Sequence, residues 1–116
     1  MSELEVIDPN ELVELFKLVD ATSIIVRTDL KGVITYANDK FCQITQYSRE
    51  EVMGKNHRIL NSGVHPKSLW TEMFQVASTG KPWRYDVCNR AKDGSLYWVD
   101  TTIMGIINTE KQLDHY

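Results

Sequence analysis

The amino-acid sequence predicts an α+β fold in which helices pack on one face of an antiparallel sheet. The expected elements follow one another as strand, strand, several helices, strand and strand, an order typical of this fold class. Residues 30–32 (LKG) and 92–94 (KDG) are tight-turn signals between strand-like segments, and such turns join antiparallel strands. A length of 116 residues is enough for one domain with one core.

The first expected element is an amphipathic helix. Asp8 can cap it, Pro9 fits its first turn, and Glu11 follows the cap by three residues. Its apolar residues recur at helical spacing and form one stripe: Leu12, Leu15, Phe16 and Val19. We expect residues 1–21 to form a capping helix and residues 22–116 to form the domain.

Two strands and a helix come next. Residues 23–29 and 32–38 are strand-like on either side of the first turn. Asn38 or Asp39 can cap the helix that follows, whose apolar side chains are Phe41, Ile44 and Tyr47.

The middle of the chain is expected to be helical. Ser48 and Glu51 have the spacing of a capping box, and Gly54 can close that short helix. Residues 56–61 read as a short helical turn. Pro66 opens a longer helix that stops at Gly80 and has one apolar face: Leu69, Trp70, Met73, Phe74 and Ala77.

The second hairpin has a predictable register. A three-residue loop with Gly94 in the left-handed region pairs Ala91 with Ser95, and therefore Asn89 with Tyr97. One face then holds Trp83, Tyr85, Val87, Asn89, Tyr97, Val99, Thr101 and Ile103. The other face holds Arg84, Asp86, Cys88, Arg90, Leu96, Trp98, Asp100, Thr102 and Met104. Because the first face is the more apolar, we expect it to face the core and Asn89 to point inward.

Composition excludes several classes of protein. A net charge of −3 with scattered Lys and Arg disfavours nucleic-acid binding. Cys42 and Cys88 lie in apolar strings without metal-type spacing, which indicates buried free thiols in a reducing cytosol. No apolar run approaches the ~20 residues that cross a bilayer, and Met1 is followed by acidic residues rather than by a signal peptide. We expect a cytoplasmic protein without a membrane segment.

Catalytic and metal-binding patterns are missing from the sequence. It has no nucleophile–base pair, no carboxylate dyad and no phosphate-binding glycine loop. The three histidines, His57, His65 and His115, have no metal-like spacing, and His65 before Pro66 is expected in a surface loop. The sequence therefore does not predict an enzyme.

Two long stretches resemble PAS domains. They are "TDLKGVITYANDKFCQITQYSREEVMGKNHRILNSG", residues 28–63, and "GKPWRYDVCNRAKDGSLYWVDTTI", residues 80–103. The resemblance runs from about Thr22 to the C-terminus. It implies a five-stranded antiparallel sheet with helices on one face, used to sense ligands, redox state or light and to dimerise. The pattern is most similar to flavin-type PAS domains, which include the light-sensing LOV branch and redox sensors.

The resemblance also implies a cofactor site. Flavin-binding relatives use an inward asparagine before the "KDG" turn, which Asn89 matches. His57 stands where LOV domains carry their reactive cysteine, so cysteinyl photochemistry is excluded. Redox-sensing relatives often have tryptophan and glycine at two further positions, where this chain has Phe74 and Tyr85. The candidate cofactor-binding residues are Asn89, His57, Phe74, Val26, Tyr85 and Val99, and the candidate cofactor is FAD or FMN.

Alternatives remain open at this point. Asn89 can instead bond to His57, to a backbone group or to water. The cavity can be filled by the chain's own side chains, Tyr85 and Phe74 among them, which would make this a ligand-free dimerisation module. A third interpretation is a haem gas sensor.

Partners follow from the expected surface. Apolar side chains on the outer sheet face form a patch that is too large for a monomer to leave exposed to solvent: Leu96, Trp98, Cys88, Met104 and Ile25. The N-terminal helix can cover it, within one chain or in a homodimer. With Met1 as the start, a sensory input module would have its output domain downstream, such as a diguanylate cyclase, a histidine kinase or a chemoreceptor. The resemblance places the start of the last strand near Gln112, so the sequence ends inside that strand.

Overall fold

The computed structural model describes residues 8–116, and its first helix begins as the sequence predicts. Helix α1 spans Pro9–Thr22, and the Asp8 carboxylate accepts a hydrogen bond from the Glu11 backbone N–H at 2.9 Å. Residues 1–7, which include Met1 and the first third of the expected 1–21 segment, lie outside the described residues. None of the helices in residues 8–116 has the length and apolar composition needed to span a bilayer.

A first core cluster forms around the first hairpin. Strand β1 (Val26–Thr28) pairs antiparallel with β2 (Ile34–Ala37), followed by α2 (Asp39–Thr45) and α3 (Arg49–Val52). The predicted capping box at the start of α3 is present, and the 3₁₀ helix η2 covers His57–Leu60. Five buried apolar side chains hold these elements together: Ile34, Ala37, Phe41, Val52 and Leu60.

A second core cluster lies between α4 and the long hairpin. Helix α4 spans Lys67–Ala77, and β3 (Trp83–Arg90) pairs antiparallel with β4 (Leu96–Ile103). The predicted register is confirmed, since Asn89 lies opposite Tyr97, and Gly94 has the left-handed φ of +89°. The buried side chains of this cluster are Leu69, Met73, Trp83 and Val87.

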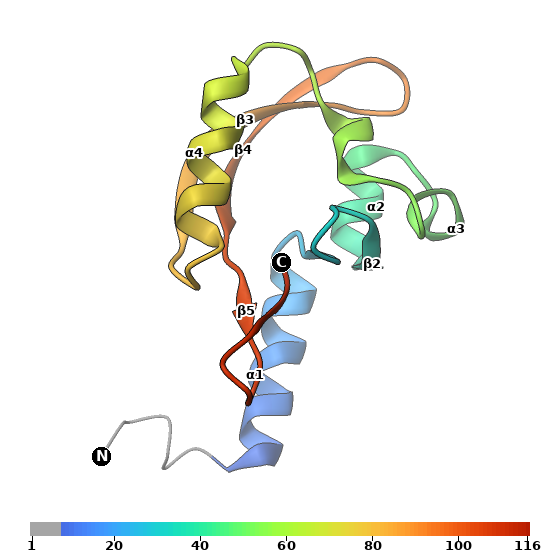
Figure 1. The fold of residues 1–116 in the computed structure, drawn as a ribbon. Coiled ribbons are helices and arrows are strands. Elements are labelled where there is room, and N and C mark those ends of the chain that lie inside the picture. Colours follow the sequence, from blue (N-terminus) through green and yellow to red (C-terminus); the bar gives the residue numbers. More distant parts are fainter. Residues whose placement is uncertain (1–7) are drawn as a thin grey trace.

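The β3–β4 hairpin connects the two clusters. In Figure 1 it arches from α4 over to the side of α2 and α3. Its tip is fastened there, because the Lys92 backbone N–H donates to the Thr45 carbonyl at 2.9 Å and the Lys92 ammonium lies 2.6 Å from Glu51. The two clusters therefore stand apart and leave room for a cavity between them.

The end of the chain returns to the first hairpin. Strand β5 (Ile106–Ile107) pairs with β6 (Leu113–His115), close to the expected start near Gln112. Tyr116 then exchanges two backbone hydrogen bonds with Thr28, at 2.9 and 3.0 Å. The three hairpins form antiparallel ladders, which confirms the α+β prediction, and the edge of β4 away from β3 pairs with no strand of residues 8–116.

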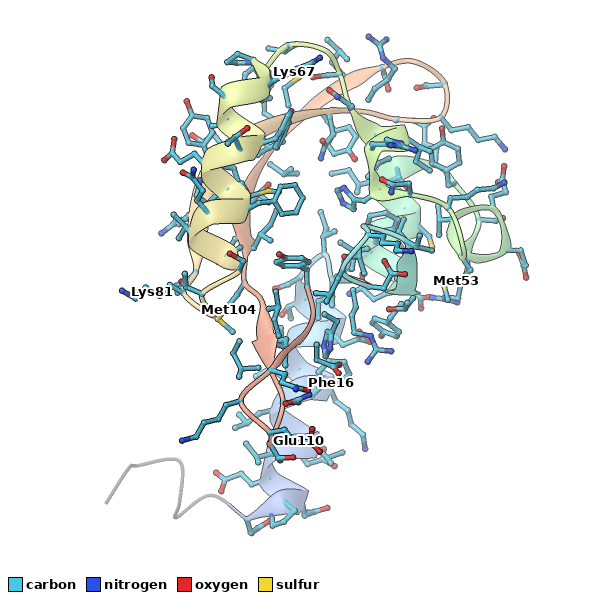
Figure 2. The ribbon with its side chains drawn as sticks, viewed as in Figure 1. Phe16, Met53, Lys67, Lys81, Met104 and Glu110 are labelled. Atoms are coloured by element: carbon cyan, nitrogen blue, oxygen red, sulfur yellow. The ribbon has the colours of Figure 1, made fainter. Side chains whose placement is uncertain are left out.

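Helix α1 does not cover the sheet. It projects from the body of the molecule beside the β5–β6 turn, and Figure 2 shows Phe16 on α1 and Glu110 in that turn. Its apolar stripe is 44–53% exposed, and no residue of α1 is buried. The outer patch also stays exposed at Leu96, Trp98 and Met104, although Cys88 is buried. Cover of the patch by the same chain's helix is therefore not observed, because α1 is attached through α2 and β2 instead.

Candidate ligand-binding site

A cavity of about 990 Å³ lies between the two clusters. Its walls come from β1, α2, η2, α4, β3 and β4, so residues far apart in the sequence face one space. The volume is at the upper end of the roughly 300–1,000 Å³ range of small-molecule sites. Part of this space runs along the free edge of β4, where Trp98 and Met104 contribute to the lining as well as to the outer patch.

Five of the six candidate residues line this cavity: Val26, His57, Phe74, Asn89 and Val99. Tyr85 is not among the lining residues. Its ring is 48% exposed and stacks on Trp83, with centroids 5.7 Å apart and planes 14° apart. The expectation that Tyr85 fills part of the cavity is therefore wrong, because its ring packs along β3 toward Trp83 and His65.

Asn89 is placed by the sheet. It lies on β3 opposite Tyr97, and a bridge to Asn61 ties this part of β3 to the segment after η2. Burial raises the pKa of the Tyr97 phenol, while the neighbouring Asn89 amide acts in the opposite direction. Asn89 and Tyr97 are thus neighbours across the two strands, and both polar side chains line the cavity.

His57 is placed by η2. Its backbone N–H donates to the Gly32 carbonyl at 2.8 Å, and its ring centroid lies 6.4 Å from that of Phe41. Burial lowers the pKa of the His57 imidazole, so the ring is neutral at pH 7. Hydrogen bonds among residues 8–116 include none to this ring, which leaves one donor and one acceptor nitrogen for a ligand in the cavity.

Several lining residues were not identified as site residues from the sequence. Trp70 lines the cavity from α4, one helical turn before Phe74, so the i, i+4 spacing of the two rings was the signal for it. Tyr97 was placed on the inward face but not named as a site residue. Lys31 and Arg58 are exposed lining residues from the first turn and from η2, and sequence periodicity carries no information about such rim positions.

His65 is a correction to the sequence interpretation. It is partly buried rather than free in a surface loop, and its Nε2 accepts the Cys88 backbone N–H at 2.9 Å. Its ring meets Trp70, Tyr85 and Trp98 edge-on at 5.7–6.1 Å. His65 therefore covers the outer edge of β3 and is structural.

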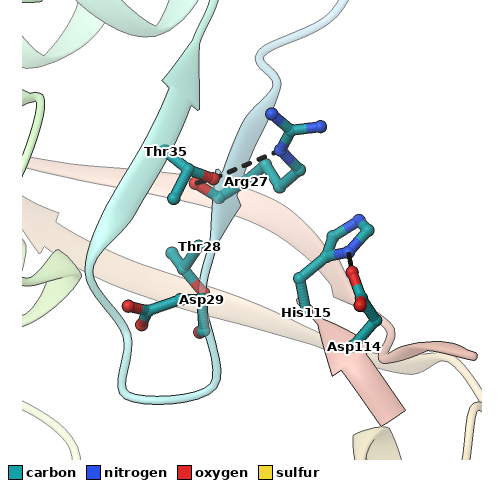
Figure 3. A pocket seen from close by; sticks show the side chains of 6 residues that line it. All are labelled: Arg27, Thr28, Asp29, Thr35, Asp114 and His115. Atoms are coloured by element: carbon teal, nitrogen blue, oxygen red, sulfur yellow. Dashed lines mark hydrogen bonds and ion pairs between the residues drawn. The ribbon is translucent and has the colours of Figure 1, made fainter. Parts of the chain in front are cut away.

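A second pocket, of about 350 Å³, lies where β1, β2 and β6 meet (Figure 3). Its polar side chains bond to one another: Arg27 Nε donates to Thr35 Oγ1 at 3.2 Å, and His115 Nδ1 lies 2.7 Å from the Asp114 carboxylate. In the part of the chain that the structure describes, no group of three His, Cys, Asp or Glu side chains is placed to hold a metal ion. The large cavity is therefore the better candidate site.

Comparison with known proteins agrees with this architecture. The nitrogen fixation regulatory protein of Klebsiella pneumoniae is 38% identical over 102 residues, which are 87% of this chain and 21% of that protein. The aerotaxis receptor of Escherichia coli strain K12 is 34% identical over 94 residues, 81% of this chain and 19% of the receptor. The chain thus spans about one fifth of the length of these relatives.

A solved structure shows the same fold. A light-oxygen-voltage domain studied with a flavin analogue superposes with a TM-score of 0.76 at 24% identity, covering 88% of this chain and 78% of that one. The family model described as a PAS domain matches residues 21–116. Since this match covers most of the chain, the chain belongs to the PAS domain family.

Proposed function

We propose that this PAS domain is a sensory input module that binds the ring system of a flavin, FMN or FAD, in the cavity between the two clusters. The observation that carries the proposal is the His57 imidazole, which lines a largely apolar cavity and makes no hydrogen bond within residues 8–116. Its two ring nitrogens are therefore available to a polar ligand in the cavity.

The other lining residues fit a flavin. Trp70, Phe74 and Val26 offer flat or apolar walls, and Asn89 adds an amide near Tyr97 for the polar edge of a ring. Lys31 and Arg58 at the exposed rim suit the phosphate of a flavin nucleotide. A bound flavin would supply a redox-active, light-absorbing group. The fold shared with a light-oxygen-voltage domain studied with a flavin analogue supports the same ligand class.

A ligand-free module is supported less well. That alternative needs the chain's own side chains to fill the cavity, and Tyr85 lies outside its lining. Phe74 lines the cavity but is 46% exposed, and its ring packs edge-on against Tyr116 at 5.6 Å.

The module would act through other parts of a signalling protein. In this proposal residues 22–116 are the sensor, and the segment before them, which contains α1 from Pro9 onward, caps it. The relatives are about five times longer than their matched region, which supports a separate output domain, such as a diguanylate cyclase or a histidine kinase. In this proposal the module itself is not catalytic and works in the cytoplasm.

A homodimer is part of the proposal. The stripe on α1 (Leu12, Leu15, Phe16 and Val19) and the outer patch on β4 (Leu96, Trp98 and Met104) are both exposed in the single chain. Burial of apolar surface contributes about 25 cal/mol per Å², so a dimer in which the second copy covers both surfaces would be stabilised.

The absorption spectrum of the purified protein, taken before and after incubation with excess FMN or FAD, tests the ligand. Wild-type protein is expected to retain flavin after desalting. Asn89→Ala should lower the retained fraction, while Gln43→Ala, an exposed amide on α2, should not. A protein that retains no flavin, or that carries a haem spectrum instead, contradicts the proposal.

A further inference from the structure

The charges around the cavity are unevenly distributed. Lys31 and Arg58 line it with exposed side chains at the rim. Asp100, from β4, is neutralised by Arg84, whose Nε donates to its carboxylate at 2.9 Å. The phenols of Tyr97 and Tyr116 complete the titratable lining groups. Among these described groups, His57 is the partly buried one that can gain a positive charge near neutral pH.

A negative charge in such a cavity needs a counter-charge. Transfer of an isolated anion into apolar surroundings costs several kcal/mol, and an opposite charge within about 4–6 Å offsets much of that cost. The same anion reverses the effect of burial on an imidazole, because it favours the charged form of the ring. A ligand that becomes an anion in the cavity would therefore draw a proton onto His57.

We propose that His57 takes up one proton when a flavin in this cavity is reduced by two electrons, and so becomes the counter-charge of the reduced ring. This inference rests on the proposed function. Two electrons from a chemical reductant such as dithionite, together with one proton, enter the ring, which leaves it with one negative charge. A second proton binds the free nitrogen lone pair of His57, so two electrons and two protons enter the cavity and its net charge is unchanged.

The proton uptake changes the chain itself. Neutral His57 has one donor and one acceptor nitrogen, whereas the protonated ring has two donors. His57 is the first residue of η2, and its backbone N–H is hydrogen-bonded to the Gly32 carbonyl in the turn between β1 and β2. Reduction would thus alter the hydrogen bonding of a side chain on one wall of the cavity.

The pH dependence of the midpoint potential of bound FMN tests the inference. One proton per two electrons changes the potential by about 30 mV for each tenfold change in proton concentration, and two protons by about 60 mV. In the pH range where the midpoint potential of free FMN in the same buffers has the one-proton slope, the midpoint potential of FMN bound to wild-type protein should have the two-proton slope. His57→Gln should return to the one-proton slope, and His115→Gln, outside the cavity lining, should keep two protons.

The outcomes separate the two proposals. Wild-type protein that retains no FMN overturns the proposed function and this inference with it. Retained FMN with a one-proton slope, or an unchanged slope in His57→Gln, overturns the role of His57 alone. If His57→Gln does not fold, nitrogen-15 NMR of the wild-type imidazole decides the matter. The ring should be protonated only with reduced FMN, and a ring that stays neutral in both states contradicts the inference.

Discussion

At the scale of single residues, Asn38 holds together three elements. Its side chain is 1% exposed and uses its whole hydrogen-bonding capacity. Oδ1 accepts the backbone N–H groups of Ile25 and Phe41 at 3.0 and 2.9 Å, and Nδ2 donates to the carbonyls of Asp20 and Ser23 at 3.0 and 2.7 Å. Asn38 therefore ties the end of α1 and the start of β1 to the first turn of α2.

Substitution of Asn38 should be strongly destabilising. Asn38→Ala leaves buried backbone groups without partners, each of which costs about 1–3 kcal/mol, so we expect a loss of about 2–4 kcal/mol in the free energy of unfolding. Urea denaturation measures it, with Gln43→Ala as an exposed control that should change stability by less than about 0.5 kcal/mol. A loss in Asn38→Ala no larger than that of the control would show that these bonds do not hold the junction.

His57 makes stability depend on pH. Burial lowers its pKa in the folded state below the ordinary value of 6.5, so the unfolded chain binds more protons in the interval between the two values. The contribution of neutral His57 to the free energy of unfolding is fully present above about pH 6.5 and is lost as the pH falls below that value. Urea denaturation between roughly pH 5 and pH 7 should show a weaker pH dependence in His57→Gln than in wild-type protein or His115→Gln. Equal pH dependence in all three would contradict burial of a neutral ring.

The sequence could identify Asn89 but not the role of Tyr85. Alternation along a strand decides which face a residue occupies, and the turn at residues 92–94 decides the register, so Asn89 was placed correctly. Alternation does not say how far along a face a cavity extends. Tyr85 shares the face of Asn89 but lies near Trp83, beyond the cavity. The unpartnered ring of His57 depends on the packing of Phe41 and η2, which local patterns do not encode.

At the scale of elements, local signals predicted the helix starts well. Asp8, Asn38 and Ser48 each cap the helix that follows through a side-chain hydrogen bond, as their sequence context indicates. Docking was harder to predict. The stripe on α1 indicates that the helix packs against an apolar surface, but it does not identify that surface. In the structure α1 projects from the molecule with its stripe exposed.

A charge in the α1 stripe should weaken the proposed homodimer. Leu12→Glu places a carboxylate in the surface that a second copy would cover, so the dissociation constant should rise by about tenfold or more, equivalent to about 1.4 kcal/mol. Asn10→Glu is the matched control, since it adds the same charge to a different side of the same helix. Sedimentation equilibrium measures both variants. A wild-type monomer at high concentration, or equal association of the two variants, would remove α1 from the interface.

At the scale of the whole molecule, the cavity separates two small cores. One lies around Phe41 and the other around Met73, and the β3–β4 hairpin joins them through its tip. The family resemblance anticipated a pocket between sheet and helices. That the pocket also runs along the free edge of β4 could not be read from the sequence, because it depends on where Tyr116 meets β1.

A ligand between the two cores should stabilise both. Binding to the folded state alone adds about 2.7 kcal/mol at a ligand concentration of 100 times the dissociation constant. We expect FMN to raise the urea midpoint of wild-type protein and to raise that of Asn89→Ala less at the same concentration. An FMN effect equal in the two proteins would mean that FMN binds elsewhere, and no effect in either would argue against binding.

The most direct test of the central claim is the amide NMR spectrum of nitrogen-15-labelled protein during a titration with FMN. We predict that the largest shift changes cluster at residues of the cavity walls, such as Val26, His57, Phe74 and Asn89, while exposed residues outside the lining, such as Glu110 in the β5–β6 turn, stay unchanged. A spectrum that FMN does not alter, or changes confined to the small pocket around Arg27 and His115, would contradict the assignment of the cavity as a flavin site.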